Sequence, residues 1–295
     1  MAQIMKSFKQ YISETLIIAG GGKRNGQVIM LAGGSGSGKS FAVTQFIDSN
    51  NYKILNPDDV LQLAVKLANQ GKAFDELKGK DLTNPEDLEV AYDVVTKKKK
   101  LAVRRREIFL QNQKPGRLPN IILDRTFSKK GQFKTWAHRL RTAGYKPENI
   151  HVIWVLTDLE IALAQNIRRG KAGERNVPAK IIIGSHQGAK EEMRDLMFKR
   201  LRGAAIDGDI FVIFGGVKNT IFYGTPEGEL PSGDTPMVVK DFRYIKVKSS
   251  GKRFDTAGNI AKKMGFIFQD MRKKQSKTGR EAYSSIEMRE SDDVV

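Results

Sequence analysis

A glycine-rich segment that ends in a lysine and a serine carries the clearest chemical signal in the sequence. It follows the pattern G-x-x-x-x-G-K-[ST], and its residues are Gly33, Gly34, Ser35, Gly36, Ser37, Gly38, Lys39 and Ser40. A candidate strand precedes it and a helical pattern follows it, which is the context that this pattern requires. Glycines let successive backbone N–H groups point at phosphate oxygens, Lys39 would bridge the β- and γ-phosphates, and Ser40 would ligate Mg²⁺. The segment, called the phosphate loop below, predicts binding of ATP or GTP.

Two aspartates follow the second candidate strand. Asp58 and Asp59 stand in the run Asn56-Pro57-Asp58-Asp59-Val60, directly after residues 52–55. Ligands of open α/β sheets bind at the carboxyl ends of the strands, so these carboxylates are expected to face the phosphate loop. One of them, with Asp58 the first candidate and Asp59 the second, would accept the proton of an attacking hydroxyl as general base. The alternative is that they only cap a helix starting at Val60.

A third aspartate, Asp124, ends the apolar run Ile121-Ile122-Leu123. An acidic residue at the end of a central strand suits the coordination shell of Mg²⁺ or a contact with substrate. The alternative is that Asp124 only fixes a turn before a helix capped by Ser128. Both interpretations place it at the same edge of the sheet as the phosphate loop.

An arginine-rich run, residues 166–178, follows the fourth candidate strand and its helix and is called the arginine segment below. Its candidate catalytic cations are Arg168, Arg169 and Arg175. Gly170 and Gly173 would make the run mobile. Its cations could then close over the γ-phosphate, where negative charge develops during phosphoryl transfer.

Short apolar runs alternate with helical patterns through the middle of the chain. The strand candidates are residues 27–32, 52–55, 120–123, 150–156 and 209–214, and the helix candidates are 39–48, 58–70, 85–112, 129–143, 158–169 and 188–202. This alternation predicts an α/β fold, a three-layer sandwich with a five-stranded parallel sheet in the order 2-3-1-4-5. Strands at 220–223 and 238–247 predict a hairpin outside that sheet. The expected units are 1–22, a core at 23–216, the hairpin at 217–248, and a basic helix and disordered tail at 249–295.

Composition limits the chemistry that the chain can perform. The sequence has no cysteine, which excludes disulfides and thiolate zinc sites. Its three histidines argue against a histidine-rich metal centre; His138 and His151 are interpreted as packing residues, and His186 as a candidate substrate contact. We find no apolar stretch of membrane-spanning length and no secretory signal, which predicts a soluble protein of the cytoplasm.

Positive charge is concentrated in two blocks. The formal net charge is +18; residues 97–106 hold seven Lys and Arg with no acid, and residues 240–280 hold thirteen against three Asp. Such blocks are either solvated faces or surfaces for an anionic partner such as DNA or RNA. The sequence leaves both interpretations open.

Taken together, the phosphate loop, Asp58 and the arginine segment resemble the zeta-toxin-like branch of small P-loop kinases, which is related to chloramphenicol phosphotransferase and polynucleotide kinases. The resemblance covers about residues 27–200 and implies ATP and Mg²⁺ as cofactors. It also implies that Asp58 is the base and that Arg168 or Arg169, together with Arg175, serves the γ-phosphate. The chain departs from the family at residues 173–176, where Gly-Gly-His is frequent, and at residues 183–186, where an arginine-rich stretch is frequent.

These departures leave the phosphoacceptor open. The favoured activity is transfer of the γ-phosphate of ATP to a hydroxyl. Within that class the acceptor is either a nucleotide sugar or other small molecule, or a polynucleotide or hydroxymethyl-base DNA, which the net charge favours. A different class is a nucleic-acid-binding NTPase without a phosphoacceptor.

The first fourteen residues form a further pattern of their own. Phe8, Tyr11 and Ile12 would share one face of a short amphipathic helix, which is followed by a Gly20-Gly21-Gly22 linker. One interpretation is a helix docked on the core. The segment also resembles the capsid-targeting leader of internal head proteins of large tailed phages, with a cleavage site at Ile12-Ser13-Glu14. That resemblance implies a phage-encoded protein that is packaged in the phage head.

Overall fold

The computed structural model describes residues 17–22, 25–113, 117–198, 206–214, 243–252, 258–262 and 264–265. The expected leader, the strand at 220–223 and the tail after residue 265 lie outside the described residues. None of the described helices is long and apolar enough to cross a membrane.

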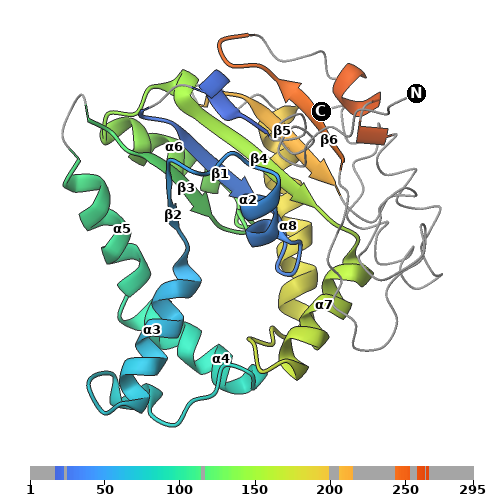
Figure 1. The fold of residues 1–295 in the computed structure, drawn as a ribbon. Coiled ribbons are helices and arrows are strands. Elements are labelled where there is room, and N and C mark those ends of the chain that lie inside the picture. Colours follow the sequence, from blue (N-terminus) through green and yellow to red (C-terminus); the bar gives the residue numbers. More distant parts are fainter. Residues whose placement is uncertain are drawn as a thin grey trace, which may run out of the picture.

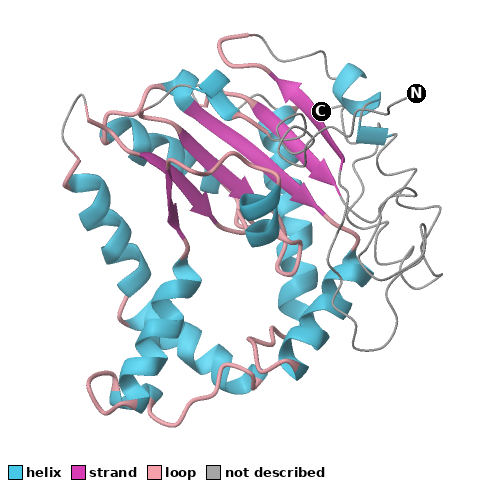
Figure 2. Ribbon diagram, viewed as in Figure 1, coloured by secondary structure: helices cyan, strands magenta, loops and turns pink. Residues whose placement is uncertain are grey.

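A six-stranded sheet forms the centre of the protein (Figures 1 and 2). Its strands are β1 (Val28–Ala32), β2 (Tyr52–Leu55), β3 (Asn120–Asp124), β4 (Ile150–Leu156), β5 (Ile210–Phe214) and β6 (Arg243–Lys248). The order is β2-β3-β1-β4-β5-β6, and the first five strands are parallel. The predicted order 2-3-1-4-5, with the strand before the phosphate loop in the middle, is therefore confirmed. The fold is the α/β three-layer fold of P-loop NTPases, with the phosphate loop after the middle strand of the parallel sheet.

The sixth strand corrects the prediction that the hairpin lies outside the sheet. β6 pairs antiparallel with β5, with Val212 opposite Ile245. Its alternating residues supply an apolar face, on which Val247 is buried, and this face extends the core by one strand. Residues 243–247 of the expected hairpin thus belong to an edge strand of the main sheet.

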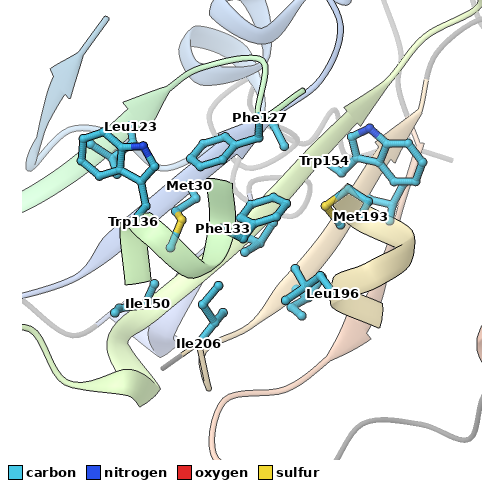
Figure 3. Packing of buried hydrophobic residues seen from close by; sticks show 14 of the residues in the cluster. Met30, Leu123, Phe127, Phe133, Trp136, Ile150, Trp154, Met193, Leu196 and Ile206 are labelled. Atoms are coloured by element: carbon cyan, nitrogen blue, oxygen red, sulfur yellow. The ribbon is translucent and has the colours of Figure 1, made fainter. Parts of the chain in front are cut away.

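Helices cover both faces of the sheet and make a three-layer sandwich. They are α2 (Lys39–Gln45), α3 (Pro57–Asn69), α4 (Pro85–Tyr92), α5 (Leu101–Gln111), α6 (Gln132–Thr142), α7 (Leu159–Lys171) and α8 (Ala179–Met197), with short turns η1 (Ala19–Gly22), η2 (Asp75–Leu77), η3 (Asp93–Lys98) and η4 (Pro147–Asn149). Met30 on one face of β1 packs with Phe133 of α6 and Met193 of α8 (Figure 3). Leu31, on the opposite face, packs with Val43 of α2. The alternation of side chains along β1 therefore divides the core in two.

A third apolar cluster lies away from the sheet. It joins α3, η2, α4 and η3 through residues that include Leu61, Leu77, Leu88 and Val94. In Figure 1 this helical unit continues from the end of β2, on the side opposite α7 and α8. The predicted continuous helix at 85–112 is wrong, because η3 is a π-helical turn and Lys100 adopts φ 53° before α5 begins.

Helix α8 begins earlier than its predicted start at residue 188. It starts at Ala179, directly after Pro178, which ends the arginine segment. Residues 179–187 are therefore helical and part of the layer that packs on the sheet. This correction places two polar side chains against the phosphate loop.

Candidate active site

The phosphate loop connects β1 to α2 and is fixed by close backbone contacts. Gly33 has φ 148°, and a Cβ there would lie 2.5 Å from the carbonyl oxygen of Val155 in β4. A Cβ on Gly36 would lie 2.8 Å from the carbonyl oxygen of Ala162 in α7. Thr157 donates its hydroxyl to the carbonyl of Ser37 at 2.8 Å. The glycines are thus needed where β4 and α7 approach the loop.

The side chain of Lys39 curls back over the loop. Its Nζ donates to the carbonyl oxygens of Gly33 and Gly34, each at 2.9 Å. Burial lowers the pKa of Lys39, while the negative charges of Asp124 and Asp58 act in the opposite direction. A lysine held within the loop by two carbonyls can exchange those contacts for phosphate oxygens without a change of backbone.

Asn56 organises the carboxylates on the β2 side of the site. Its side-chain oxygen accepts the backbone N–H of Asp58 at 2.9 Å and caps α3, which begins at Pro57. Its side-chain nitrogen donates to Asp124 Oδ2 at 3.0 Å. The alternative in which Asp58 or Asp59 caps a helix starting at Val60 is therefore wrong, whereas the predicted helix at 58–70 lies within one residue of α3 at each end. Asp59 is exposed, whereas Asp58 is partly buried.

Asp124 lies at the end of β3, and it is 5% exposed. Burial raises the pKa of its carboxyl, and the charge of Lys39 partly offsets that effect. The helix after it, α6, is not capped by Ser128 as predicted. Instead, Glu192 of α8 accepts the backbone N–H of Gly131 at 2.6 Å. Glu192 of α8 thus holds the turn before α6. Asp124 is therefore not needed to fix that turn.

The arginine segment reaches across to Asp58. Arg175 Nη1 lies 2.6 Å from Asp58 Oδ1. Asn166 of α7 holds the segment by two hydrogen bonds to the backbone of Val177, at 2.8 and 2.7 Å. The backbone N–H of Asn176 donates to the carbonyl of Leu82, in the unit built by α3 and α4. The arginine segment therefore connects α7 with the helical unit built by α3 and α4.

The three candidate arginines have different surroundings. Arg175 is joined to Asp58, as described above. Arg169 forms an exposed ion pair with Glu174, with Nε 3.0 Å from Oε2. Arg168 is partly buried near the end of α7. Of the predicted cations, Arg175 thus contacts a candidate catalytic carboxylate.

Two residues on α8, Ser185 and His186, form hydrogen bonds to the backbone of the phosphate loop. Ser185 Oγ accepts the backbone N–H of Ser35 at 2.8 Å, and His186 Nε2 donates to the carbonyl of Ser35 at 3.0 Å. A Cβ on Gly34 would lie 2.0 Å from His186 Cδ2, so the ring packs directly on the loop. His186 was predicted as a substrate contact; Ser185 was missed because the helical pattern before residue 188 was not recognised.

His186 makes stability depend on pH. Burial lowers its pKa from 6.5 to about 4, so the folded protein resists protonation that the unfolded chain accepts. The contribution of this group to the free energy of unfolding is fully present above pH 6.5 and is lost as the pH falls toward 4.

The free energy of unfolding is expected to drop by about 2 kcal/mol between pH 8 and pH 5 through His186. Denaturant unfolding of His186→Gln, which keeps an N–H donor, should show a pH dependence weaker by that amount; an equal dependence would contradict the assignment.

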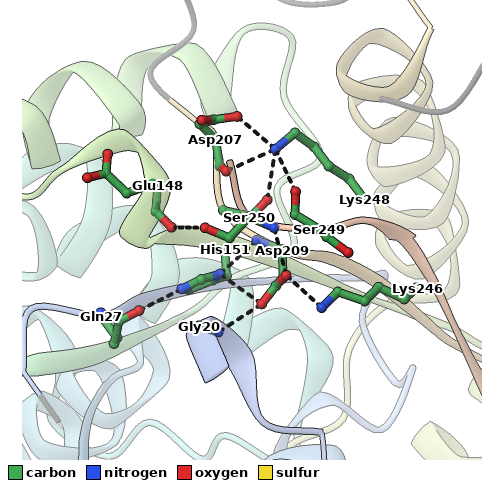
Figure 4. Close-up of polar contacts among 11 residues, drawn as sticks. Gly20, Gln27, Glu148, His151, Asp207, Asp209, Lys246, Lys248, Ser249 and Ser250 are labelled. Carbon is green, nitrogen blue, oxygen red and sulfur yellow. Dashed lines mark hydrogen bonds and ion pairs between the residues drawn. The ribbon is translucent and has the colours of Figure 1, made fainter. Parts of the chain in front are cut away.

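The other two histidines lie away from the site, as predicted. His138 is exposed on α6. His151 is fully buried, with Nε2 donating to Gln27 and Nδ1 accepting the N–H of Asp209. Asp209 also accepts the N–H of Gly20 and pairs with Lys246 (Figure 4). This network joins η1, β4 and β6 near the amino end of β4, opposite the phosphate loop.

The donors expected for Mg²⁺ fit the usual chemistry of phosphoryl transfer. In the described part of the chain no three acidic or histidine side chains form a metal-binding group. Mg²⁺ in such sites is bound by one or two protein oxygens together with substrate phosphates and water. Ser40 at the start of α2 and Asp124 at the end of β3 are the residues that would supply such donors.

Three of the seven basic residues in the first basic block form ion pairs at the surface. Lys97 and Lys98 lie 2.9 and 3.7 Å from the carboxylate of Asp93, and Lys99 lies 3.1 Å from Glu76. These lysines are exposed, and exposed pairs contribute little to stability. They can therefore exchange their carboxylates for an anionic partner at small cost.

Comparison with known proteins identifies the family. The model of the AAA domain family matches residues 28–191, more than half of the chain, so the protein belongs to that family. The matched region contains the phosphate loop, Asp58, Asp124 and the arginine segment. No curated protein sequence matches.

Solved structures resemble this chain at low sequence identity. A chain of the AvrRxo1-ORF1:AvrRxo1-ORF2 complex with ATP has a TM-score of 0.50 and 13% identity over 82% of this chain. This protein spans 64% of the length of that chain. A chain of the PezAT toxin–antitoxin system of Streptococcus pneumoniae has a TM-score of 0.45 and 13% identity over 94% of this chain and 88% of its own length. Deoxyadenosine kinase of M. mycoides with dATP has a TM-score of 0.34 and 16% identity over 63% of this chain and 89% of its own length.

Proposed function

We propose that the protein is an ATP-dependent kinase that transfers the γ-phosphate to a hydroxyl, in the manner of the zeta-toxin-like kinases. The observation that carries the proposal is the ion pair of Asp58 with Arg175 beside the phosphate loop. A carboxylate on the acceptor side and a cation within its reach are the two groups that phosphoryl transfer to an alcohol requires. Nucleotide binding itself follows from the phosphate loop and the family.

The residues divide the reaction between them. The phosphate loop and Lys39 hold the β- and γ-phosphates, and Ser40 and Asp124 would bind Mg²⁺, which neutralises charge on those phosphates. Asp58 accepts the proton of the acceptor hydroxyl as its oxygen forms a bond to the γ-phosphorus. The bond between the γ-phosphorus and the bridging oxygen breaks, and ADP leaves. Arg175 exchanges Asp58 for the γ-phosphate, which frees the carboxylate for the proton and supplies positive charge where negative charge develops.

The acceptor decides between the related functions. Incubation with γ-labelled ATP and separate pools of DNA, RNA, nucleotide sugars and protein should transfer label to one of these pools. Label on DNA or RNA would establish the polynucleotide or hydroxymethyl-base kinase. Label found only as free phosphate in every pool would replace the kinase by an NTPase without a phosphoacceptor.

Nucleic acid as a partner has a separate test. If the exposed lysines of the first basic block bind phosphates, affinity for DNA or RNA should fall steeply with salt, because each neutralised phosphate releases counterions. Replacing Lys97, Lys98, Lys99 and Lys100 by glutamine should flatten the slope of log K against log salt by about 0.9 for each phosphate that the variant no longer neutralises. Four glutamines at Lys66, Lys72, Lys78 and Lys80 provide a control of equal charge. Equal slopes in both variants would return the block to a solvated surface.

A further inference from the structure

Arg106 of α5 is a buried cation without a hydrogen-bond partner for two of its nitrogen atoms. Its side chain belongs to a residue that is 7% exposed, and its Nε and Nη1 atoms contact no acceptor. A guanidinium that is removed from water normally keeps its donors paired, because an unpaired buried charge is costly. The fold thus retains at this position a group that needs an acceptor from outside the chain.

The charged surroundings of Arg106 oppose its positive charge more than they compensate it, because the effects of Arg125 and Arg139 on its pKa exceed those of Tyr92 and Glu107. The Cζ atom of Arg106 lies 5.2 Å from the centre of the Trp136 ring, and those of Arg125 and Arg139 lie 5.4 and 5.6 Å from the same centre. Within the described residues none of the three arginines forms an ion pair with a carboxylate. Burial and the charges of Arg125 and Arg139 lower the pKa of Arg106 to about 10, so it remains a cation at pH 7.

The contact with Trp136 does not by itself account for three cations. A cation–π contact is weaker than the penalty for burying an unpaired charge, and one indole ring offers its negative potential only over its two faces. An anion bound to Arg106 would satisfy its free donors and screen its repulsion with the two neighbouring guanidinium groups. The cluster therefore has the character of an anion site.

A small open hollow beside Arg106 shares one residue, Asn56, with the candidate active site. It is lined by Leu55, Asn56, Pro57, Val60, Ala102, Arg105 and Arg106. Asn56 also bonds Asp124 and caps the helix turn that carries Asp58. An anion held there would thus lie beside Asn56, the residue that caps the helix turn carrying Asp58.

We propose that Arg105 and Arg106 bind a phosphate group of the phosphoacceptor, so that the substrate is a small alcohol that already carries a phosphate. The inference rests on the proposed kinase function and names the substrate class of that same site. The planar guanidinium of Arg106 can present two parallel N–H donors to phosphate oxygens, whereas the ammonium of a lysine acts as a point charge. Arg105, which is exposed at the same hollow, would supply the second cation.

Binding of inorganic phosphate tests the site apart from turnover. The phosphate loop is first saturated with Mg²⁺ and a non-hydrolysable ATP analogue, and phosphate is then titrated by calorimetry. We expect one further phosphate to bind, with an affinity that Arg105→Gln lowers by about ten- to a hundredfold, the usual effect of one charge-assisted hydrogen bond. Arg104→Gln, an exposed neighbour that does not line the hollow, should bind phosphate as the original chain does.

A variant of the buried Arg106 provides a second test, which measures the Tm with and without phosphate. Arg106→Met replaces an unpaired charge by an apolar chain of similar length and should fold with a Tm equal to or above that of the original protein in phosphate-free buffer. It should also lose the rise in Tm that phosphate gives the original chain. A Tm well below the original, with phosphate still bound, would show that Arg106 only packs the core and would overturn the proposal.

The kinase function and this inference fail in different ways. Phosphate binding at the hollow without transfer of label to any acceptor would reject the kinase and keep the anion site. Transfer to alcohols that carry no phosphate, with the same KM in Arg105→Gln as in the original chain, would reject the inference and keep the kinase. Absence of phosphate binding in the original chain, once its phosphate loop is filled, would also reject the inference.

Discussion

Asp58→Asn is expected to lower turnover by about 10² to 10⁴, the usual contribution of a general base, while ATP binding stays nearly intact. The amide cannot accept the proton of the acceptor hydroxyl, although it has almost the same shape as the carboxylate. ATP binding depends mainly on the phosphate loop, which Asp58 does not contact through any hydrogen bond in the described residues. Turnover from labelled ATP and the Kd of an ATP analogue, measured on the same preparation, separate the two effects.

The neighbouring aspartate provides the control for this experiment. Asp59 stands one residue further along the first turn of α3, about 100° around the helix, and is exposed. Asp59→Asn should therefore keep normal turnover. A loss in Asp59→Asn together with normal turnover in Asp58→Asn would move the base by one residue. Normal turnover in both variants would place the base elsewhere.

The ion pair of Asp58 with Arg175 should affect activity more than stability. The two side chains are 35% and 24% exposed, and pairs that are open to solvent to this extent contribute little to folding. In the proposed reaction Arg175 must leave Asp58 when the γ-phosphate arrives. The pair is thus a resting arrangement that places both groups at the point of transfer.

The sequence predicted the parts of the site that follow from the topology of a parallel sheet. Lys39, Asp58 and Asp124 each come after the carboxyl end of a strand, and such ends meet at one edge of the sheet. The signal for Asn56 was also present, since asparagine followed by proline is a frequent start of a helix, with proline in the first position. The predicted helix at 58–70 therefore begins one residue after the observed start, and only the alternative with an aspartate cap places the start as late as Val60.

Other features could not be read from local patterns because tertiary contacts decide them. The buried face of α8 carries Ser185 and His186 among apolar residues, so the apolar periodicity is broken where the helix meets the phosphate loop. Lys100 adopts positive φ although lysine has no preference for that conformation, so nothing in the sequence marks the break between η3 and α5. β6 joins the sheet because β5 otherwise exposes an edge, a condition that only the assembled fold creates.

Lys39→Ala is expected to lower phosphoryl transfer by at least about 10³. The variant lacks the cation that stabilises the negative charge on the β- and γ-phosphate oxygens during transfer. The fold should persist, since the hydrogen bonds of Nζ reach only the carbonyls of Gly33 and Gly34 in the loop itself. Those carbonyls can bond water once the side chain is removed. Unchanged circular dichroism and a Tm within a few degrees should therefore accompany the loss of activity.

Lys66→Ala is the matched control for that variant. Lys66 is an exposed lysine in the last turn of α3, so its removal changes the net charge equally without touching the phosphate loop. It should retain full turnover, which would exclude loss of overall charge as the cause. Full phosphoryl transfer by Lys39→Ala would refute the assignment of the loop. Unfolding of Lys39→Ala would instead show that Lys39 is a structural group, because its two loop contacts would then be required to hold β1 and α2 in place.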